Sequence, residues 1–133
     1  MTDKDAVLAA NAAFYSAFSA GTIEEMARLW ADNDDISCIH PGWPALVGRP
    51  AVIGSWRDIL LSPHRPEIVC QEPYAIVTGN TGRVLCVEVI GPLALAATNH
   101  FRRVGAAWRL VHHQSSPIAQ AVSAETPPNR QIH

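Results

Sequence analysis

The chain has 133 residues, enough for one domain with a sizeable hydrophobic core. Its 12 acidic and 10 basic residues give a net charge of −2 with neutral histidines. No basic stripe stands out, so a nucleic acid or another polyanion is not an expected partner. No apolar run approaches the roughly 18 residues of a membrane span, and the first residues lack the cationic start of a secretory signal. We therefore expect no membrane partner.

The three cysteines, Cys38, Cys70 and Cys86, each lie in an apolar run and form no CxxC pair. A free cysteine in such a run behaves as a small buried hydrophobe, whereas a disulfide framework belongs to oxidising compartments. We predict reduced thiols and a cytoplasmic location.

The N-terminal part of the chain predicts two helices. Apolar residues recur at helical spacing over residues 4–20, and Gly21 suits a C-terminal cap. Thr22 followed by Glu25 matches a capping box, which predicts a second helix that begins there and runs to about Trp30.

The middle of the chain predicts a short strand, a loop and a third helix. The strand covers residues 36–40 and stops at Pro41-Gly42. Residues 43–47 form a loop or a short edge strand. The third helix covers residues 50–61, with Pro50 suited to its first turn.

Four longer strands follow, at residues 67–78, 83–90, 95–104 and 108–115, separated by short turns that favour an antiparallel meander. Helices first and strands afterwards predict an α+β domain, in which the helices cover one face of a curved antiparallel sheet. We assign the domain to residues 1–122. Residues 123–133, where the periodicity fades, predict a flexible tail.

The last hairpin combines apolar and polar side chains. Strict alternation along residues 108–115 puts His112 on the same face as Trp108 and Leu110, and puts His113 on the opposite face with Arg109 and Val111. A face that mixes apolar bulk with imidazole and amide groups is typical of the floor of a partly polar pocket. We expect the opposite face to make a dimer contact.

Two segments, AGTIEEMARLWADNDDISCIHPGWPALVGRPAVIGSW and ATNHFRR followed by WRLVHHQSSP, resemble the SnoaL-like branch of the nuclear transport factor 2-like (ketosteroid isomerase-like) superfamily. The resemblance covers roughly residues 5–118. It implies a cone-shaped α+β fold with three N-terminal helices on the concave face of the sheet, a cavity between helices and sheet, and usually a homodimer. It does not fix the function, because this fold hosts both enzymes and non-catalytic binding subunits.

The catalytic residues of ketosteroid isomerases are not matched. Where those enzymes place a carboxylate base before a proline, this chain has His40, and where they place a protonated aspartic acid before His-Phe-Arg, it has Asn99. Phe14 occupies the place of their helix tyrosine. The neighbouring Tyr15 lies about 100 degrees round the helix and is no automatic substitute. Steroid isomerase activity is therefore not expected.

Four residues are candidates for catalysis. His40 is suited to act as a general base near neutral pH, or else caps a turn. Asn99 is suited to donate a hydrogen bond to an oxyanion, or else satisfies a neighbouring strand. His112 either lines the pocket or has a purely structural role. Glu88 lies in an apolar strand, where burial raises a carboxyl pKa, and is either an acid–base partner or the ion-pair partner of an arginine among Arg102, Arg103 and Arg109.

Four aromatic residues are candidates for ligand binding, although core packing is their alternative role: Trp43, Trp56, Phe101 and Tyr15. Trp43, beside Pro41-Gly42, is placed at a rim. No metal-ligand spacing, glycine-rich phosphate loop or nucleophile motif is found, so no cofactor and no metal are expected.

Two functions remain open from the sequence. One is a cofactor-independent isomerase, cyclase, dehydratase or hydrolase that acts on a small apolar, carbonyl-bearing molecule. The other is a non-catalytic ligand-binding or protein-assembly module. A homodimer is expected in either case. The predicted helices can cover only one face of the sheet, and a second copy of the chain would cover the other face.

Overall fold

The computed structural model describes residues 1–118, which fold into three helices and one six-stranded sheet. Residues 119–133, and with them the predicted tail, lie outside the described residues. The elements follow in the order α1 (Asp3–Ala20), α2 (Ile23–Leu29), β1 (Ser37–Ile39), β2 (Leu46–Val47), α3 (Arg49–Leu61), β3 (Val69–Thr78), β4 (Thr81–Ile90), β5 (Leu93–Val104) and β6 (Ala107–Pro117). The predicted α+β fold and all its elements are confirmed, with boundaries shifted by a few residues.

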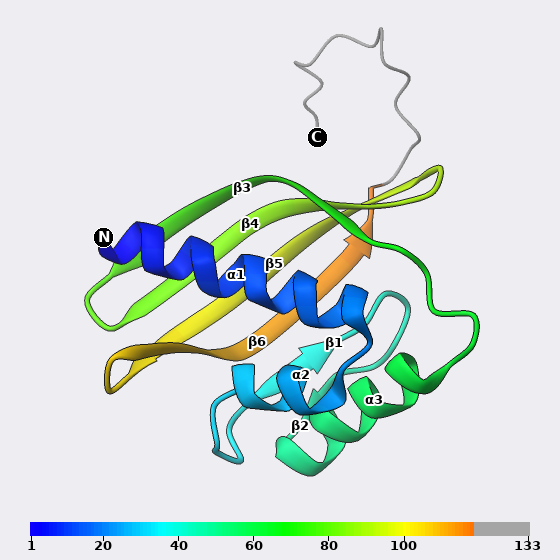
Figure 1. Cartoon of the computed structure of the whole chain (residues 1–133), viewed down its shortest axis with the longest axis horizontal. Helices are drawn as coiled ribbons and strands as arrows, with labels where there is room; N and C mark the ends of the chain where they lie inside the picture. The colour runs from blue at the N-terminus through cyan, green and yellow to red at the C-terminus, as the bar shows by residue number, and fades with distance from the viewer. Residues whose placement is uncertain (119–133) are drawn as a thin grey trace, which may run out of the picture.

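The sheet is mixed, whereas the sequence analysis predicted an antiparallel one (Figure 1). Its strand order is β2-β1-β6-β5-β4-β3, and the predicted meander of β3 to β6 is antiparallel throughout. The exception is β1, which pairs in parallel with β6. Because a parallel pair needs a long crossover, β1 and β6 meet only after the chain has passed through α3 and the meander.

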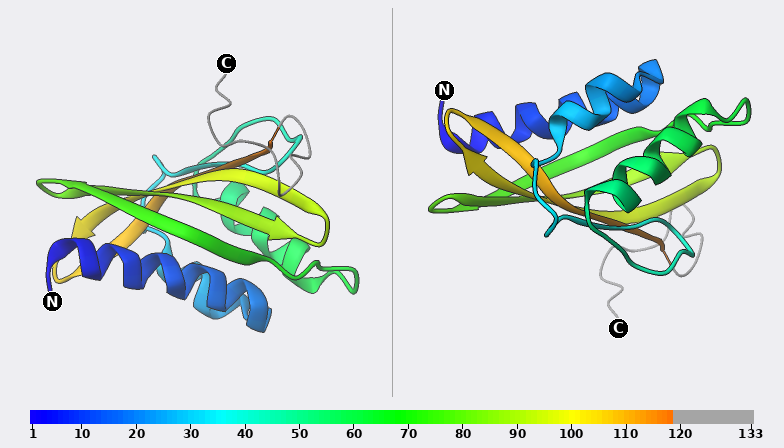
Figure 2. Two further views of the ribbon diagram at one scale, coloured as in Figure 1. Left: turned by 90° about the horizontal axis from the view of Figure 1, so that it is seen from above. Right: turned by 90° about the horizontal axis from the view of Figure 1, so that it is seen from below.

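The helices lie on the concave face of the curved sheet, and α1 runs along the long strands (Figure 2). Helix α1 begins with a capping box between Thr2 and Asp5 and ends at Gly21, whose φ of 69° is the left-handed conformation that glycine accepts most readily. Its buried side includes Val7, Phe14 and Phe18, which belong to the main core. None of the helices within residues 1–118 is long and apolar enough to cross a lipid bilayer.

The capping box predicted for α2 is wrong. The side chain of Thr22 makes no capping hydrogen bond, and Glu25 forms an ion pair with Arg28 one turn further along the helix. The end of α2 is instead stabilised from α3 by Arg49, whose guanidinium donates hydrogen bonds to the backbone carbonyls of Ala27, Trp30 and Ala31. These bonds fix the start of α3, the helix that carries Trp56, against the end of α2.

A bulge in β6 reverses the faces predicted for its histidines. Phe101 pairs with Leu110 but His100 pairs with His112, so Val111 is an extra residue without a partner in β5. Because one extra residue moves every later side chain to the other face, His113 is buried with Leu110, while His112 lies on the opposite face. The prediction that His112 faces inward and His113 outward is therefore wrong.

Gly82 is the point of closest approach between β4 and α1. A Cβ atom at this position would lie 2.9 Å from Cγ2 of the fully buried Val7. We expect Gly82→Ala to lower the free energy of unfolding by about 1–3 kcal/mol, because the added methyl group overpacks the core. Chemical denaturation measures this change.

Gly54 provides the matched control, because it lies within α3 and a Cβ atom there meets nothing within 4 Å outside its own helix. Gly54→Ala should raise stability by up to about 1 kcal/mol through helix propensity. In a Val7→Ala background the cost of Gly82→Ala should shrink. A Gly82→Ala protein as stable as the wild type would contradict the close packing of α1 on β4.

Candidate active site

A cavity of about 170 Å³ lies between the helices and the concave face of the sheet. Most of its wall is apolar. The lining residues come from α1 (Phe14, Tyr15, Phe18), from the end of β1 (His40, Pro41), from α3 (Trp56, Ile59), from the segment that leads into β3 (Pro66, Ile68), and from the sheet (Glu88, Ile90, Leu95, His113, Ser115). Polar side chains therefore gather on the sheet floor and at the end of β1.

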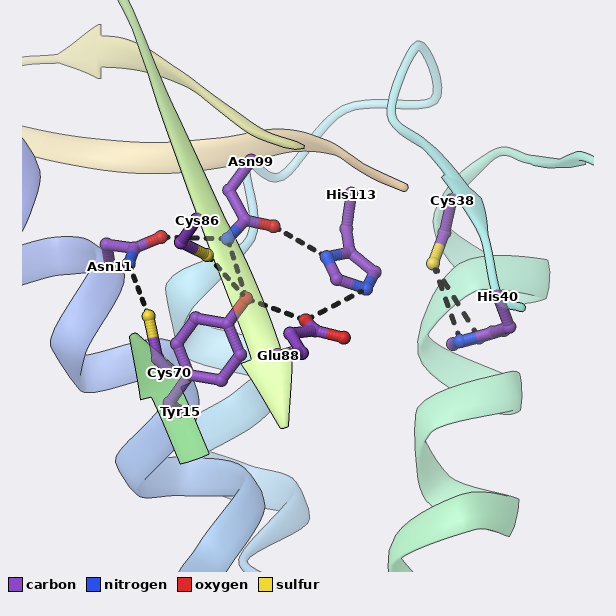
Figure 3. A network of polar contacts seen from close by, with 9 residues as sticks. All are labelled: Asn11, Tyr15, Cys38, His40, Cys70, Cys86, Glu88, Asn99 and His113. Carbon is purple, nitrogen blue, oxygen red and sulfur yellow. Dashed lines mark hydrogen bonds and ion pairs between the residues drawn. The ribbon is translucent and has the colours of Figure 1, made fainter. Parts of the chain in front are cut away.

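Glu88 is the acidic group of the cavity. Its side chain is 3% exposed, and its Oε2 accepts a 2.6 Å hydrogen bond from the hydroxyl of Tyr15 (Figure 3). Burial raises the pKa of this carboxyl, and the hydrogen bond from Tyr15, followed by the nearby hydroxyl of Ser115, offsets part of that rise. Burial, followed by the charge of Glu88, in turn raises the pKa of Tyr15. The carboxyl at the floor of the cavity therefore holds its proton to a higher pH than an exposed glutamate does.

An ion pair between Glu88 and an arginine, the alternative considered from the sequence, is not formed. Arg102 pairs with Asp35 and Arg103 with Asp3, both at the surface. Arg109 donates a hydrogen bond to the backbone carbonyl of Arg28.

His113 is the base that lies beside Glu88. Its Nδ1 is 2.5 Å from Oδ1 of Asn99, and because an amide oxygen only accepts, the imidazole proton is on Nδ1. The lone pair is then on Nε2, which lies 4.0 Å from Oε2 of Glu88. Complete burial, together with His40 and His112 nearby, lowers the pKa of His113 to about 3, which keeps the imidazole neutral.

Asn99 holds this arrangement together from β5. Its Nδ2 donates both protons, to Oδ1 of Asn11 at 2.8 Å and to the hydroxyl of Tyr15 at 3.1 Å. Its Oδ1 accepts from His113. The amide therefore has no hydrogen left for a ligand, and its contacts orient the hydroxyl of Tyr15 and the ring of His113.

His40 lies across the cavity from His113, with 6.4 Å between the ring centroids. Its Nε2 is 2.9 Å from the hydroxyl of Ser55, which gives its own proton to the carbonyl of Val52 at 2.7 Å. Nε2 must therefore donate, which leaves the lone pair on Nδ1. Burial lowers the pKa of His40 to about 4, so this imidazole is also neutral.

The structure places the predicted site residues in two groups. His40, Glu88, Tyr15 and Trp56 line the cavity, and Asn99 contacts two of the lining side chains, Tyr15 and His113. The second group, His112, Phe101 and Trp43, does not line the cavity.

Each member of the second group has another environment. Nδ1 of His112 is 2.7 Å from the hydroxyl of Ser37, on the far face of the sheet. Phe101 is buried in the main core. Trp43 is 45% exposed, with its ring edge-on to His40 at a centroid distance of 4.8 Å.

Sequence reasoning missed His113, Ser115 and Asn11. The first two were missed because the bulge at Val111 carries no marker in the sequence. Asn11 carried a signal that was overlooked: it is an amide on the apolar side of α1, four residues before Tyr15, and side chains at that spacing share a helix face. Such a buried amide needs a partner, and Asn99 provides it.

The sequence profile of the SnoaL-like domain matches residues 7–120. The chain belongs to the SnoaL-like domain family. The resemblance noted from the sequence is therefore confirmed. Within residues 1–118, no group of three or more histidine, cysteine or acidic side chains is placed to hold a metal ion in this SnoaL-like domain.

Two solved structures illustrate the relationship. A protein of Streptomyces avermitilis described as a "putative dehydratase from the NTF2-like family" is 36% identical, over 89% of this chain and 97% of that one, with a TM-score of 0.81. A Thiobacillus denitrificans protein described as a "putative calcium/calmodulin-dependent protein kinase type II association domain" is 33% identical, over 83% of this chain and 93% of that one, with a TM-score of 0.75.

Among curated proteins, F-box protein SKIP8 of Arabidopsis thaliana is 28% identical over 126 residues. The match covers 84% of this chain and 49% of that protein. The chain thus spans about half the length of the curated relative that it matches.

The two buried histidines predict a loss of stability on acidification below about pH 6.5, which the raised pKa of Glu88 partly opposes. An unfolded imidazole titrates near 6.5, but the folded pKa values of His40 and His113 are about 4 and about 3, so on acidification the unfolded chain takes up more protons and stability falls. Glu88 acts in the opposite sense: above 4.5 the unfolded carboxyl loses a proton that the folded protein keeps, so its contribution falls as pH rises. Because two histidines outweigh one carboxyl, the net stability should fall as the pH drops from about 6.5 towards 4.

Thermal and urea unfolding from pH 4 to pH 9 would measure this curve, whose slope is at most about 1.4 kcal/mol per pH unit for each proton. Glu88→Gln removes the opposing contribution and should make the loss of stability on acidification steeper. A wild-type stability that does not fall between pH 6.5 and pH 4 would contradict the lowered pKa values of His40 and His113.

Proposed function

We propose that the cavity binds a small apolar molecule with a carbonyl group and carries out cofactor-independent acid–base chemistry on it, of the dehydration or isomerisation kind. The observation that carries this proposal is the pair formed by Glu88 and His113. A buried carboxyl with a raised pKa lies 4.0 Å from the unprotonated Nε2 of a buried histidine, in an otherwise apolar cavity. Such a pair offers one proton to give and one site to receive a proton.

Glu88 and His113 together can give and accept the protons that a dehydration requires. Nε2 of His113 takes the proton from the carbon next to the carbonyl, and the electron pair of that bond forms the new C=C bond. The hydroxyl on the adjacent carbon leaves with the proton of Glu88 as water. The resulting imidazolium then returns its proton to the Glu88 carboxylate, which restores the starting state.

Two further residues complete the proposed site. His40 lies across the cavity from His113, and its Nδ1, 3.9 Å from Sγ of Cys38, is a second proton acceptor, so we keep for His40 the role of base predicted from the sequence. Asn99 is a positioning residue in place of the oxyanion donor predicted earlier, because both of its amide protons are already used. The Streptomyces avermitilis relative, described as a dehydratase, supports the reaction class.

Exchange of carbon-bound hydrogen for deuterium tests the proposal without knowledge of the substrate. Purified protein in D2O should accelerate exchange at the carbons beside the carbonyl of small cyclic ketones, such as cyclohexanone, as measured by NMR. Glu88→Gln and His113→Asn should each reduce the acceleration by about 10²- to 10⁴-fold, the usual contribution of a general acid or base.

His112→Asn is the matched control, because His112 is adjacent in sequence but lies outside the cavity. It should exchange at the wild-type rate. Ketones that bind but exchange equally slowly with wild-type protein and with both cavity variants would favour the alternative function, a non-catalytic ligand-binding module.

We also propose that the protein is a homodimer through the convex face of the sheet. A protein-assembly module is the alternative function that such a face would serve. Tyr74 and Leu85 are paired across β3 and β4 and are 61% and 40% exposed, so this face presents apolar side chains to solvent. His113, predicted to lie in the dimer contact, cannot take part because it is buried at the cavity. The relative described as an association domain supports an assembly role.

Sedimentation velocity at micromolar concentration should give a dimer, and Leu85→Glu should shift it to the monomer because a charge would be buried in the contact. Leu61→Glu is the matched control: Leu61 is 72% exposed, but it lies at the end of α3. A wild-type monomer at these concentrations would refute the dimer.

A cytoplasmic location remains part of the proposal. It rests on the three cysteines, which are all free in the structure, as reduced thiols would be.

A further inference from the structure

The cavity contains a polar group that the acid–base pair does not use. Among the residues that the structure describes, three buried side-chain polar atoms lack a hydrogen-bond partner, and two of them, Oγ of Ser115 and Nε1 of Trp56, belong to residues that line the cavity. Ser115 is 2% exposed, and its hydroxyl makes no hydrogen bond of normal geometry, although it lies close enough to Glu88 to lower the pKa of that carboxyl. Leaving a buried hydroxyl unpaired costs about 1–3 kcal/mol, so an acceptor supplied by a ligand is expected beside Ser115.

The size of the cavity limits the ligand. An apolar cavity of about 150 Å³ in a protein core is known to hold benzene. The volume here, about 170 Å³, therefore fits one six-membered ring with a small substituent and is too small for fused rings. Three aromatic side chains are placed to contact such a ring: Trp56 meets Phe14 and Phe18 edge-on, at centroid distances of 5.4 and 6.2 Å.

The charge of the lining limits the ligand further. No lysine or arginine lines the cavity, and burial favours the neutral form of each of its titratable side chains, His40, His113, Glu88 and Tyr15. A carboxylate or ammonium group would be transferred from water without a charged partner, at a cost of several kcal/mol. An uncharged molecule meets no such penalty.

We propose that the ligand is an uncharged molecule with a single six-membered ring, whose oxygen accepts a hydrogen bond from Ser115 and whose ring lies against Phe14, Phe18 and Trp56. This names the substrate class of the proposed function and rests on the same cavity. An oxygen bound at Ser115 lies on the sheet floor beside Glu88, where a carbonyl or hydroxyl oxygen could receive the proton of the acid. The volume of the cavity excludes larger cyclic substrates. The lack of a lysine or arginine in its lining excludes ring molecules that carry a carboxylate.

Binding of unreactive probes tests this proposal independently of turnover. Isothermal titration calorimetry at pH 7 would compare phenol, toluene, 2-naphthol and benzoate on the wild-type protein. Phenol should bind more tightly than benzoate and 2-naphthol by about tenfold or more, because the charge of benzoate is unpaired and the second ring of 2-naphthol does not fit.

Ser115→Ala should weaken phenol binding about fivefold, the loss of one hydrogen bond, and leave toluene binding within about twofold of the wild type. Ser116→Ala is the matched control, since Ser116 is the next residue of β6 and is exposed outside the cavity. It should change neither affinity. Unfolding curves of both variants would establish that the fold is kept.

The outcomes separate this proposal from the proposed function. If Ser115→Ala leaves phenol binding unchanged, Ser115 holds at most a water molecule, and the proposal is wrong. If 2-naphthol or benzoate binds as tightly as phenol, the assigned ligand class is wrong, whether or not exchange is catalysed. If the probes bind as expected but no ketone exchanges, the ligand class stands and the acid–base function fails.

Discussion

The structure depends on a chain of hydrogen bonds that crosses its core, from α1 through β5 to β6. Asn11 accepts from Asn99, Asn99 accepts from His113, and Asn99 also donates to Tyr15, which donates to Glu88. Each group would be costly to bury alone, and each has its partner within the chain of bonds. The network ties the first helix to the centre of the sheet and fixes the orientation of every polar side chain in it.

The same burial sets the chemistry of the cavity. Desolvation raises the pKa of Glu88 and lowers that of His113, so the acid holds its proton to a higher pH than an exposed glutamate does and the base stays free at neutral pH. An exposed pair would ionise to an ordinary salt bridge, in which the acid has no proton to give and the base has no free lone pair. Stability and reactivity are therefore coupled, because groups that are best placed for proton transfer are also groups that the fold must hold away from water.

The aromatic side chains form one wall of the cavity. Trp56 contacts Phe14, Phe18, His40 and His113 edge-on or tilted, and so forms one wall from α3. The position of that wall depends on Arg49, which holds the start of α3 against the end of α2. A shift of α3 would therefore change the cavity before it disturbed the sheet.

The sequence by itself determined the elements and their order, because periodicity and turns are local properties of the chain. The family followed from the resemblance of two segments to SnoaL-like proteins, which the match to the SnoaL-like domain confirms. It also marked Glu88 and His40 as unusual, since a carboxyl in an apolar strand and a histidine before a proline stand out from their neighbours. Only the tertiary structure decided which groups meet. The bulge at Val111 arises from how β6 pairs with β5, and it exchanged the faces of the two adjacent histidines. Protonation states were likewise beyond the sequence, because they follow from burial and from partners that are distant in the chain.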